Sequence, residues 1–221
     1  VWRFLLNDDV YNNSTGENFP VKILQYSGSS TVNTLRIKPS TGKNVIISAT
    51  NANSYTGMPA VFQLEGADSI IIDGSNVSGG TSRNLTILNN DGVEYSARTT
   101  VWIASLGTNN ANNIRILNTK LQMQNLNQYG IQLSGIFVGG NAIGGNNALG
   151  GSVATAAHSN LTFNNNEFVN VRQGIIVSGN SSLRTTGITV TGNQMGSTND
   201  AQKPNVPLQF TNASNVSITD N

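Results

Sequence analysis

Short stretches in which apolar and polar residues alternate recur along the whole chain. The clearest region is 60–90, where three such stretches follow one another at 62–65, 70–73 and 85–88. Gly66-Ala67-Asp68 and Asp73-Gly74 interrupt them with residues that favour turns. Alternation over four or five residues, bounded by Gly, Asn, Asp or Ser, is the pattern of a short strand with one buried face.

The same three-strand unit repeats downstream. Its apolar pairs are Val101/Ile103, Ile114/Ile116, Leu121/Met123, Ile131/Leu133, Leu161/Phe163, Ile175/Val177, Ile188/Val190, Leu208/Phe210 and Val216/Ile218. In three units the third strand starts seven residues after the second, at 114 to 121, 161 to 168 and 188 to 195. A period of 20–50 residues indicates a repeat architecture, and three short strands per repeat favour a coil of parallel strands over an antiparallel sandwich.

Small polar residues occupy the predicted corners. Aligning the second strands places one set just after them: Gly74, Asn118, Asn165, Gly192 and Asp220. Another set precedes them: Ser69, Asn113, Asn160, Gly187 and Asn215. Gly and Asn tolerate the left-handed conformation of a sharp corner, and stacked asparagine amides can bond as a ladder. We therefore expect these residues to be structural.

These patterns predict an all-β protein, a single-stranded parallel β-helix of five to six coils with an aliphatic core. The helix spans 1–221 as one domain, and the Gly/Asn-rich segment 139–157 is a loop insertion that projects from it. Strand-like residues reach both ends of the chain, at 1–6 and 216–219. We therefore expect a segment of a longer, multidomain chain with adjoining domains on the same polypeptide.

Composition narrows the choice of partners. The formal net charge is +1 and only 10% of residues are charged, which argues against nucleic acid as a partner. No apolar run reaches the roughly 18–20 residues of a membrane span. The chain has no cysteine, which fits an exported bacterial protein with a large core and a reduced cytosolic one equally well.

Residues 60–90 carry a resemblance to a known group. Leu64-Glu65-Gly66-Ala67-Asp68, Ile72-Asp73-Gly74 and the run Gly80 to Ile87 (GTSRNLTI) resemble repeats of large secreted surface and adhesin proteins of bacteria. Their fold is the right-handed parallel β-helix of the pectin-lyase-like kind. The resemblance implies a secreted or cell-surface location and a structural or adhesive role. The resemblance implies no cofactor.

Two other classes of function stay open. Enzymes of the pectin-lyase-like group act over the first strand of each coil, where Glu65 is the one carboxylate among the residues expected to face outward. A glycosidase needs a pair of carboxylates, so we predict no catalytic residues; a polysaccharide lyase or glycosidase with acids on loops remains the alternative. The second open class is a tail fibre or spike of the phage type. The single histidine, His158, is expected to be a solvated loop residue rather than a metal ligand, and no metal site is predicted.

Trp102 is the main candidate for ligand binding. If Trp102 faces outward between Gln63 and Gln132, with Glu65 beside them, an indole plate is flanked by amides. Sugar rings stack on such plates while amides bond to hydroxyls, so the four residues predict a platform for a polysaccharide or cell-surface glycan. The competing prediction is that the 139–157 insertion folds over Trp102 and buries it.

Overall fold

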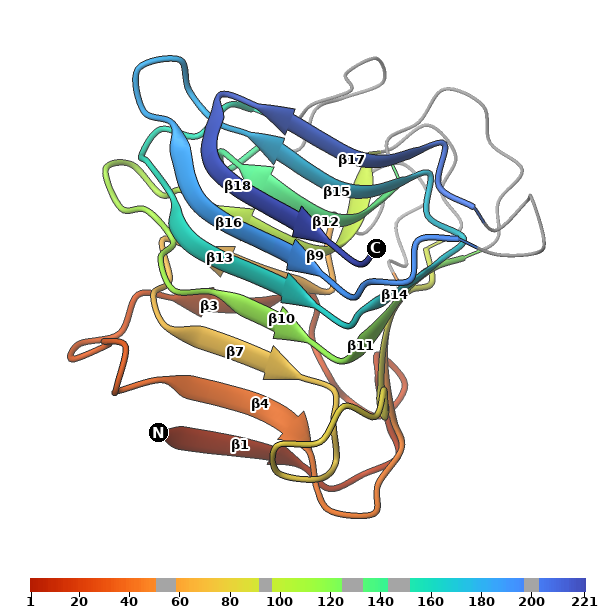
Figure 1. Ribbon diagram of the computed structural model, residues 1–221. Helices are drawn as coiled ribbons and strands as arrows, with labels where there is room; N and C mark the ends of the chain where they lie inside the picture. The colour runs from red at the N-terminus through yellow and green to blue at the C-terminus, as the bar shows by residue number, and fades with distance from the viewer. Residues whose placement is uncertain (51–58, 92–96, 125–132, 143–151, 197–202) are drawn as a thin grey trace.

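A computed structural model describes residues 1–50, 59–91, 97–124, 133–142, 152–196 and 203–221 (Figure 1). All regular elements in these ranges are β-strands, arranged in three sheets whose strand pairs are all parallel. The same ranges contain no helix long and apolar enough to cross a membrane.

The three sheets are formed by every third strand. The seven-stranded sheet contains β1 (Trp2–Leu6), β4 (Leu35–Pro39), β7 (Ile70–Asp73), β10 (Arg115–Leu117), β13 (Ser159–Asn164), β16 (Thr185–Thr191) and β18 (Ala213–Thr219). The five-stranded sheet contains β2 (Val10–Asn12), β5 (Val45–Ala49), β8 (Leu85–Asn89), β11 (Thr119–Met123) and β14 (Glu167–Val169). The six-stranded sheet contains β3 (Val21–Leu24), β6 (Phe62–Glu65), β9 (Arg98–Ala104), β12 (Leu133–Gly139), β15 (Gln173–Ser178) and β17 (Val206–Thr211).

The strand order is that of a parallel β-helix. Coil 1 is β1–β3, coil 2 is β4–β6, and each later coil again takes one strand from each sheet. In coil 6 a single bridge between Glu167 and Gln194 takes the place of a strand in the five-stranded sheet. In Figure 1 the front strands run to the right, the rear strands run to the left, and successive coils rise, so the winding is right-handed. The predicted fold class is therefore confirmed, with about six coils.

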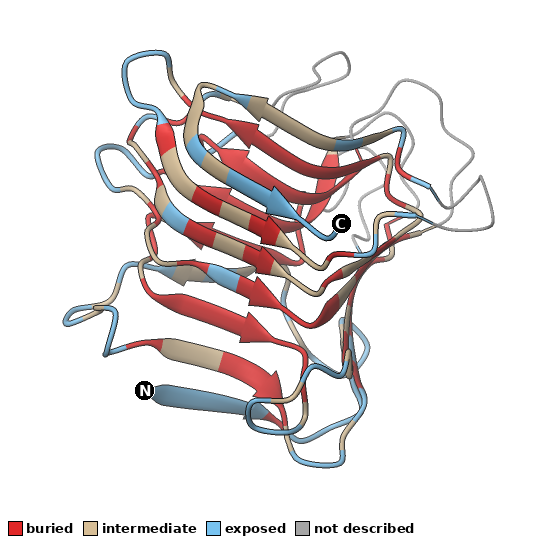
Figure 2. Ribbon diagram, in the orientation of Figure 1, coloured by how far each residue is buried: buried red, intermediate tan, exposed pale blue. Residues whose placement is uncertain are grey.

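Aliphatic columns fill the interior of the coils, as the sequence predicted. Leu161 of β13 lies opposite Ile188 of β16, and Ile188 lies opposite Val216 of β18. In the neighbouring column, Ile116 of β10 lies opposite Ile72 of β7 on one side and Phe163 of β13 on the other. In this second column Ile72, Ile116 and Phe163 are completely buried, whereas Phe4 and Ile218 at the two ends of the stack are 60% and 49% exposed. The outermost strands are correspondingly the least buried (Figure 2). Parallel strands with both neighbours paired favour such aliphatic stacks.

The corner residues adopt the backbone conformation that their types predicted. The first set of corner residues lies just before the apolar pairs of the seven-stranded sheet, and all of its members have positive φ: Ser69, Asn113, Asn160, Gly187 and Asn215. Asn118, Asn165, Gly192 and Asp220, which directly follow strands of the seven-stranded sheet, also have positive φ. Gly74 is the exception, because its φ is not positive and the chain leaves this corner into the loop 75–84. Its small size is required instead, since a Cβ there would lie 1.9 Å from the carbonyl oxygen of Asn118.

Two ladders of side-chain hydrogen bonds run along this corner. In the outer ladder, Asn165 donates to Asn118 and Asn118 donates to Asp73, each at 2.8 Å. An inner ladder, which was not predicted from the sequence, connects successive coils through Thr119, Asn166, Asn193 and Asn221. Because buried amides need partners, the two ladders together fix the positions of successive coils from coil 3 to the C-terminal end of the stack.

One predicted strand register was wrong. Ile131 and Leu133 were expected to be the inward pair next to Val101 and Ile103, but Ile136 and Val138 of β12 occupy these positions. Leu133 is nevertheless buried in the interior, and Ile131 lies outside the described residues. Both pairs satisfy a period of two and lie five residues apart, so the pattern alone could not separate them. Consequently Phe137, and not Gln132, is the cross-strand neighbour of Trp102.

Candidate functional site: the outer face of the six-stranded sheet

The outer face of the six-stranded sheet carries one continuous row of side chains. Pairing of its strands sets these residues side by side, in the order Lys22, Gln63, Trp102, Phe137, Ile176 and Gln209. We call this set the outer row. Its four central members are buried. Three of these buried members, Trp102, Phe137 and Ile176, are apolar, so the middle of this outer face is packed against other parts of the protein.

Trp102 is the centre of a second hydrophobic cluster, separate from the interior of the coils. Its ring packs against Phe137, with centroids 6.5 Å apart and planes inclined by 54°. Ala60, Ala104 and Ile176 complete the cluster. The indole Nε1 donates a hydrogen bond to the carbonyl oxygen of Gly140 at 3.0 Å. A buried indole whose N–H has a partner is a packing residue in this environment.

The predicted glycan platform is not formed as an exposed surface. Only 4% of Trp102 is exposed, and Gln63 is equally buried. Gln132 lies outside the residues that the structure describes. Trp102 faces outward as predicted, but the hypothesis that its indole is accessible was wrong. Contact with Gly140, which belongs to the 139–157 insertion, favours the competing prediction that this segment contributes to its burial.

Glu65, the fourth residue of the predicted platform, is held by its neighbours. Its Oε1 accepts a hydrogen bond from Gln63 Nε2 and lies 3.8 Å from Lys22 Nζ. The next residue along its row is Ala104, which carries no acid. Within the described part of the chain, no group of three or more His, Cys, Asp and Glu side chains could hold a metal ion. Glu65 therefore forms an ion pair with Lys22 and accepts a hydrogen bond from the Gln63 amide. The adjacent position on β9 offers no second carboxylate.

His158 lies in the interior and not in solvent, so the expectation of a solvated loop residue was wrong. The N–H of Ala111 donates to its Nδ1 at 3.0 Å, which places the ring proton on Nε2. Nε2 in turn lies 3.0 Å from the carbonyl oxygen of Gly139. Burial lowers the pKa of His158, since the charged form would lose its hydration. The neutral ring joins β12 and the 105–113 connection to the segment that precedes β13.

A buried ion pair at the start of β9 was not found from the sequence. Arg98 and Asp91 are almost completely buried, and Nη1 of Arg98 lies 3.9 Å from Asp91 Oδ1. The same Nη1 donates to the backbone oxygen of Asp91. Burial lowers the pKa of Arg98, and the carboxylate of Asp91 opposes that shift. Asp91 and Arg98 are seven positions apart across a connection without periodicity, so no sequence pattern indicated that they would meet.

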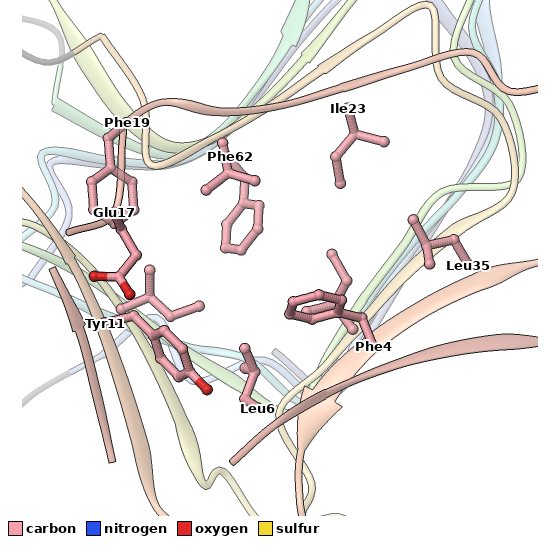
Figure 3. A pocket seen from close by; sticks show the side chains of 11 residues that line it. Phe4, Leu6, Tyr11, Glu17, Phe19, Ile23, Leu35 and Phe62 are labelled. Carbon is pink, nitrogen blue, oxygen red and sulfur yellow. The ribbon is translucent and has the colours of Figure 1, made fainter. Parts of the chain in front are cut away.

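A large apolar cavity lies at the N-terminal end of the stack (Figure 3). It has a volume of about 400 Å³. Its lining comes from coils 1 and 2: Phe4, Leu6, Tyr11, Glu17, Phe19, Val21, Ile23, Leu35, Ile37, Ile47 and Phe62. Glu17 Oε2 accepts hydrogen bonds from the backbone N–H of Asn12, at 3.0 Å, and from the Thr15 hydroxyl. The Thr15 hydroxyl is the main cause of the lowered pKa of Glu17.

Comparison with known proteins gives no relative: no family model, curated protein or solved structure matches the chain. The class that the strand order itself defines is the parallel β-helix solenoid. Fold alone does not determine function, which depends on the sites and surfaces that the fold carries.

Proposed function

We propose that this chain is a non-catalytic structural and adhesive segment of an exported bacterial surface protein. In this role the β-helix is a stiff rod that carries loops and makes weak contacts with glycans. The observation that carries the proposal is the buried outer row, in which Trp102, Phe137 and Ile176 occupy the position where a β-helix enzyme would bind its polymer.

The internal construction also supports a mechanical role. Interior columns connect successive coils, and from coil 3 onward two side-chain ladders connect them as well. In a repeat protein, stability is approximately the sum of such contacts between neighbouring units. A rod built in this way should resist bending, because its coils from coil 3 onward are fixed both in the core and at the corner.

A polar cleft along the first three coils provides a surface for glycan contact. It has a volume of about 390 Å³ and is lined only by neutral side chains: Asn12, Asn13, Ser14, Ser48, Thr50 and Asn90. Amides and hydroxyls exchange hydrogen bonds with sugar hydroxyls as they do with water, so binding to such a cleft is weak. In this proposal the cleft takes over the glycan contact that was expected at Trp102.

The test separates a rod from an enzyme. The purified chain is incubated with a panel of uronic and neutral polysaccharides, and release of reducing or unsaturated ends is measured. We expect no release from any of them, and retention on some immobilised glycans that weakens in Asn90→Ala. Asn44→Ala, which alters an exposed amide outside this cleft, is the control. Depolymerisation of any polymer would overturn the proposal in favour of a lyase or glycosidase.

A further inference from the structure

Cationic side chains lie next to one another on the outer face of the seven-stranded sheet, the face turned toward the viewer in Figure 1. Strand pairing sets one row of residues side by side on β1, β4, β7 and β10: Arg3, Arg36, Ile71 and Arg115. On β4, β7 and β10 these residues face outward, because the residues that flank them belong to the interior. We call this set the arginine row.

One carboxylate lies beside the arginine row, and it is already engaged. Asp73, at the end of β7, accepts hydrogen bonds from Asn118 Nδ2 at 2.8 Å and from the backbone N–H of Ser75 at 3.1 Å. Its other oxygen lies 3.4 Å from Arg36 Nη1. Nε of Arg36 is buried and has no hydrogen-bond partner. Asp73 therefore satisfies only part of one guanidinium.

Three further cations on these strands add charge that is not neutralised. Arg3 and Arg115 are exposed, and Lys38, which faces the same side of β4 as Arg36, is 7% exposed. No ion pair or hydrogen bond of these three side chains is found in the described part of the chain. Four cations thus share this face with one carboxylate, although the formal net charge of the whole chain is only +1.

The spacing of these cations favours a linear partner with several negative charges. Neighbouring strands lie about 4.8 Å apart, so Arg3 is directly opposite Arg36, and Arg115 follows two strands later. Like charges opposite one another destabilise a sheet, and an anionic group placed between them replaces this repulsion with attraction. The arginine row crosses the strands, so a polymer that lies along the stack of coils reaches all of its cations.

Beyond Arg115 the same row continues with hydroxyl groups. Strand pairing places Thr162, Thr189 and Ser217 next in line on β13, β16 and β18. Hydroxyls can donate to sugar hydroxyls and accept from them. The whole row, from Arg3 to Ser217, contains no aromatic side chain on which nucleic-acid bases could stack. Cations followed by hydroxyls are complementary to an acidic glycan.

We propose that the outer face of the seven-stranded sheet binds an acidic polysaccharide, a glycan polymer that carries sulfate or carboxylate groups. The arginine row and Lys38 hold the acid groups, while the hydroxyls of β13, β16 and β18 bond to sugar hydroxyls. This inference rests on the proposed function in taking a glycan as the partner, and it adds selection for negative charge. It uses none of the residues that line the polar cleft.

A series of polymers with one backbone tests charge selection. Plain dextran, dextran sulfate, carboxymethyl dextran and the cationic diethylaminoethyl dextran are immobilised, and binding of the full chain to each is measured. We expect both anionic dextrans to bind more tightly than plain dextran and the cationic one to bind more weakly. The difference should vanish at about 0.5 M salt, where charge interactions are screened. The tighter of the two anionic polymers identifies the preferred acid group.

Substitutions connect this selection to the arginine row. Arg3→Gln and Arg115→Gln each remove an exposed, unpaired charge, so each should weaken binding to dextran sulfate roughly two- to fivefold. The double variant should show the combined loss. Arg184→Gln is the matched control, because Arg184 is exposed directly before β16 and outside the row. It should bind like the unmodified chain, and circular dichroism verifies that all variants are folded.

Three results would overturn the proposal. Equal binding to plain and anionic dextran would show a face without charge selection. Unchanged binding in the double variant would place the acid groups elsewhere. Binding of a DNA duplex as tightly as dextran sulfate, with the same loss in the double variant, would make nucleic acid the partner. None of these results affects the proposed function, which depends on absence of depolymerisation and on glycan retention that weakens in Asn90→Ala.

Discussion

Arg83 binds both the backbone and the side chain of Asn165, a residue two coils away. Its Nε donates to the carbonyl oxygen of Asn165 at 2.8 Å, and its Nη2 donates to Oδ1 at 2.9 Å. Asn165 Nδ2 returns a hydrogen bond to the carbonyl oxygen of Thr81 at 2.7 Å. The loop 75–84, which follows Gly74, therefore lies along the corner ladder, and Nη1 of Arg83 reaches Gln194 in coil 6. We call this loop the 75–84 strap.

Replacing Arg83 by lysine should weaken this strap. An ammonium group cannot present the two parallel donors of a guanidinium, and loss of these bonds should lower the free energy of unfolding by about 1–2 kcal/mol. Urea denaturation measures the change. Arg115→Lys is the matched control, because Arg115 is exposed on β10, and it should change stability by less than about 0.5 kcal/mol. Equal effects of the two substitutions would contradict a clamping role for Arg83.

Substitution of Asn166 should lower the free energy of unfolding more than substitution of most other asparagines in the chain. It is completely buried, donates to Ile116 O and to Asn193 Oδ1, and accepts bonds from the backbone N–H and the hydroxyl of Thr119. Asn166→Ala leaves these groups without partners, so we expect a loss of about 2–4 kcal/mol in thermal or chemical unfolding.

The control for Asn166 is an asparagine on the surface. Asn44 accepts a hydrogen bond from Asn84 at 2.6 Å and is exposed. Asn44→Ala should therefore lower stability by less than about 1 kcal/mol. If both substitutions had the same effect, the inner ladder would not be a source of stability.

The regular part of the fold could be predicted, because the structural requirements of its interior and of its corners each restrict which residue types can occupy a position. The interior columns require apolar residues at alternate positions, as at Leu161 and Phe163, and the corners require residues that accept positive φ, as at Asn113 and Asn160. Both requirements repeat from coil to coil. A repeated constraint is visible in one sequence even without relatives.

The surfaces could not be predicted, because they depend on contacts that occur once. Trp102 alternates with inward-facing residues, so the pattern predicted that it faces outward, but the pattern could not show whether it is exposed or covered, because its burial involves Phe137 and Gly140, more than thirty positions later. Arg83 meets Asn165 across 82 positions. Neither contact has a periodic signal, and the register of β12 was ambiguous between two equivalent apolar pairs.

The burial of Trp102 predicts its fluorescence. The chain has two tryptophans, and Trp2 is 68% exposed whereas Trp102 is 4% exposed. In Trp2→Phe, the remaining emission from Trp102 should lie at shorter wavelength and resist quenching by iodide. In Trp102→Phe, the remaining emission from Trp2 should lie at longer wavelength and be quenched readily. Equal quenching in the two variants would show that the outer row is open to solvent.

His158 should make the stability depend on pH in a defined direction. Its pKa is lowered in the folded protein, so the unfolded chain binds the proton more readily. The stabilisation is therefore fully present above the unfolded pKa of about 6.5 and is lost as pH falls below it, by up to about 1.4 kcal/mol per pH unit. Since His158 is the only histidine, urea denaturation between pH 7.5 and 5.5 isolates its effect from that of Glu17, whose lowered pKa acts below about 4.5.

The control for this pH dependence is His158→Gln, which keeps a polar side chain but does not titrate. Its stability at pH 7.5 should be lower than that of the unmodified chain, because the bonds to Ala111 and Gly139 are disturbed. Its loss of stability between pH 7.5 and 5.5 should be much smaller. An unchanged pH dependence in this variant would mean that other groups are responsible.

Two glycines of one corner column should respond differently to substitution, because they are glycine for different reasons. A Cβ at Gly74 would lie 1.9 Å from the carbonyl oxygen of Asn118, so the backbones of coils 3 and 4 must separate in Gly74→Ala. We expect a loss of about 3 kcal/mol or more, or failure to fold. Gly192 has φ of 62°, a Cβ there would have no neighbour closer than 3.9 Å, and asparagine has the same conformation at 118 and 165. Gly192→Asn should therefore stay within about 1 kcal/mol of the unmodified chain in thermal unfolding, and the reverse order of the two effects would refute this account of the corner.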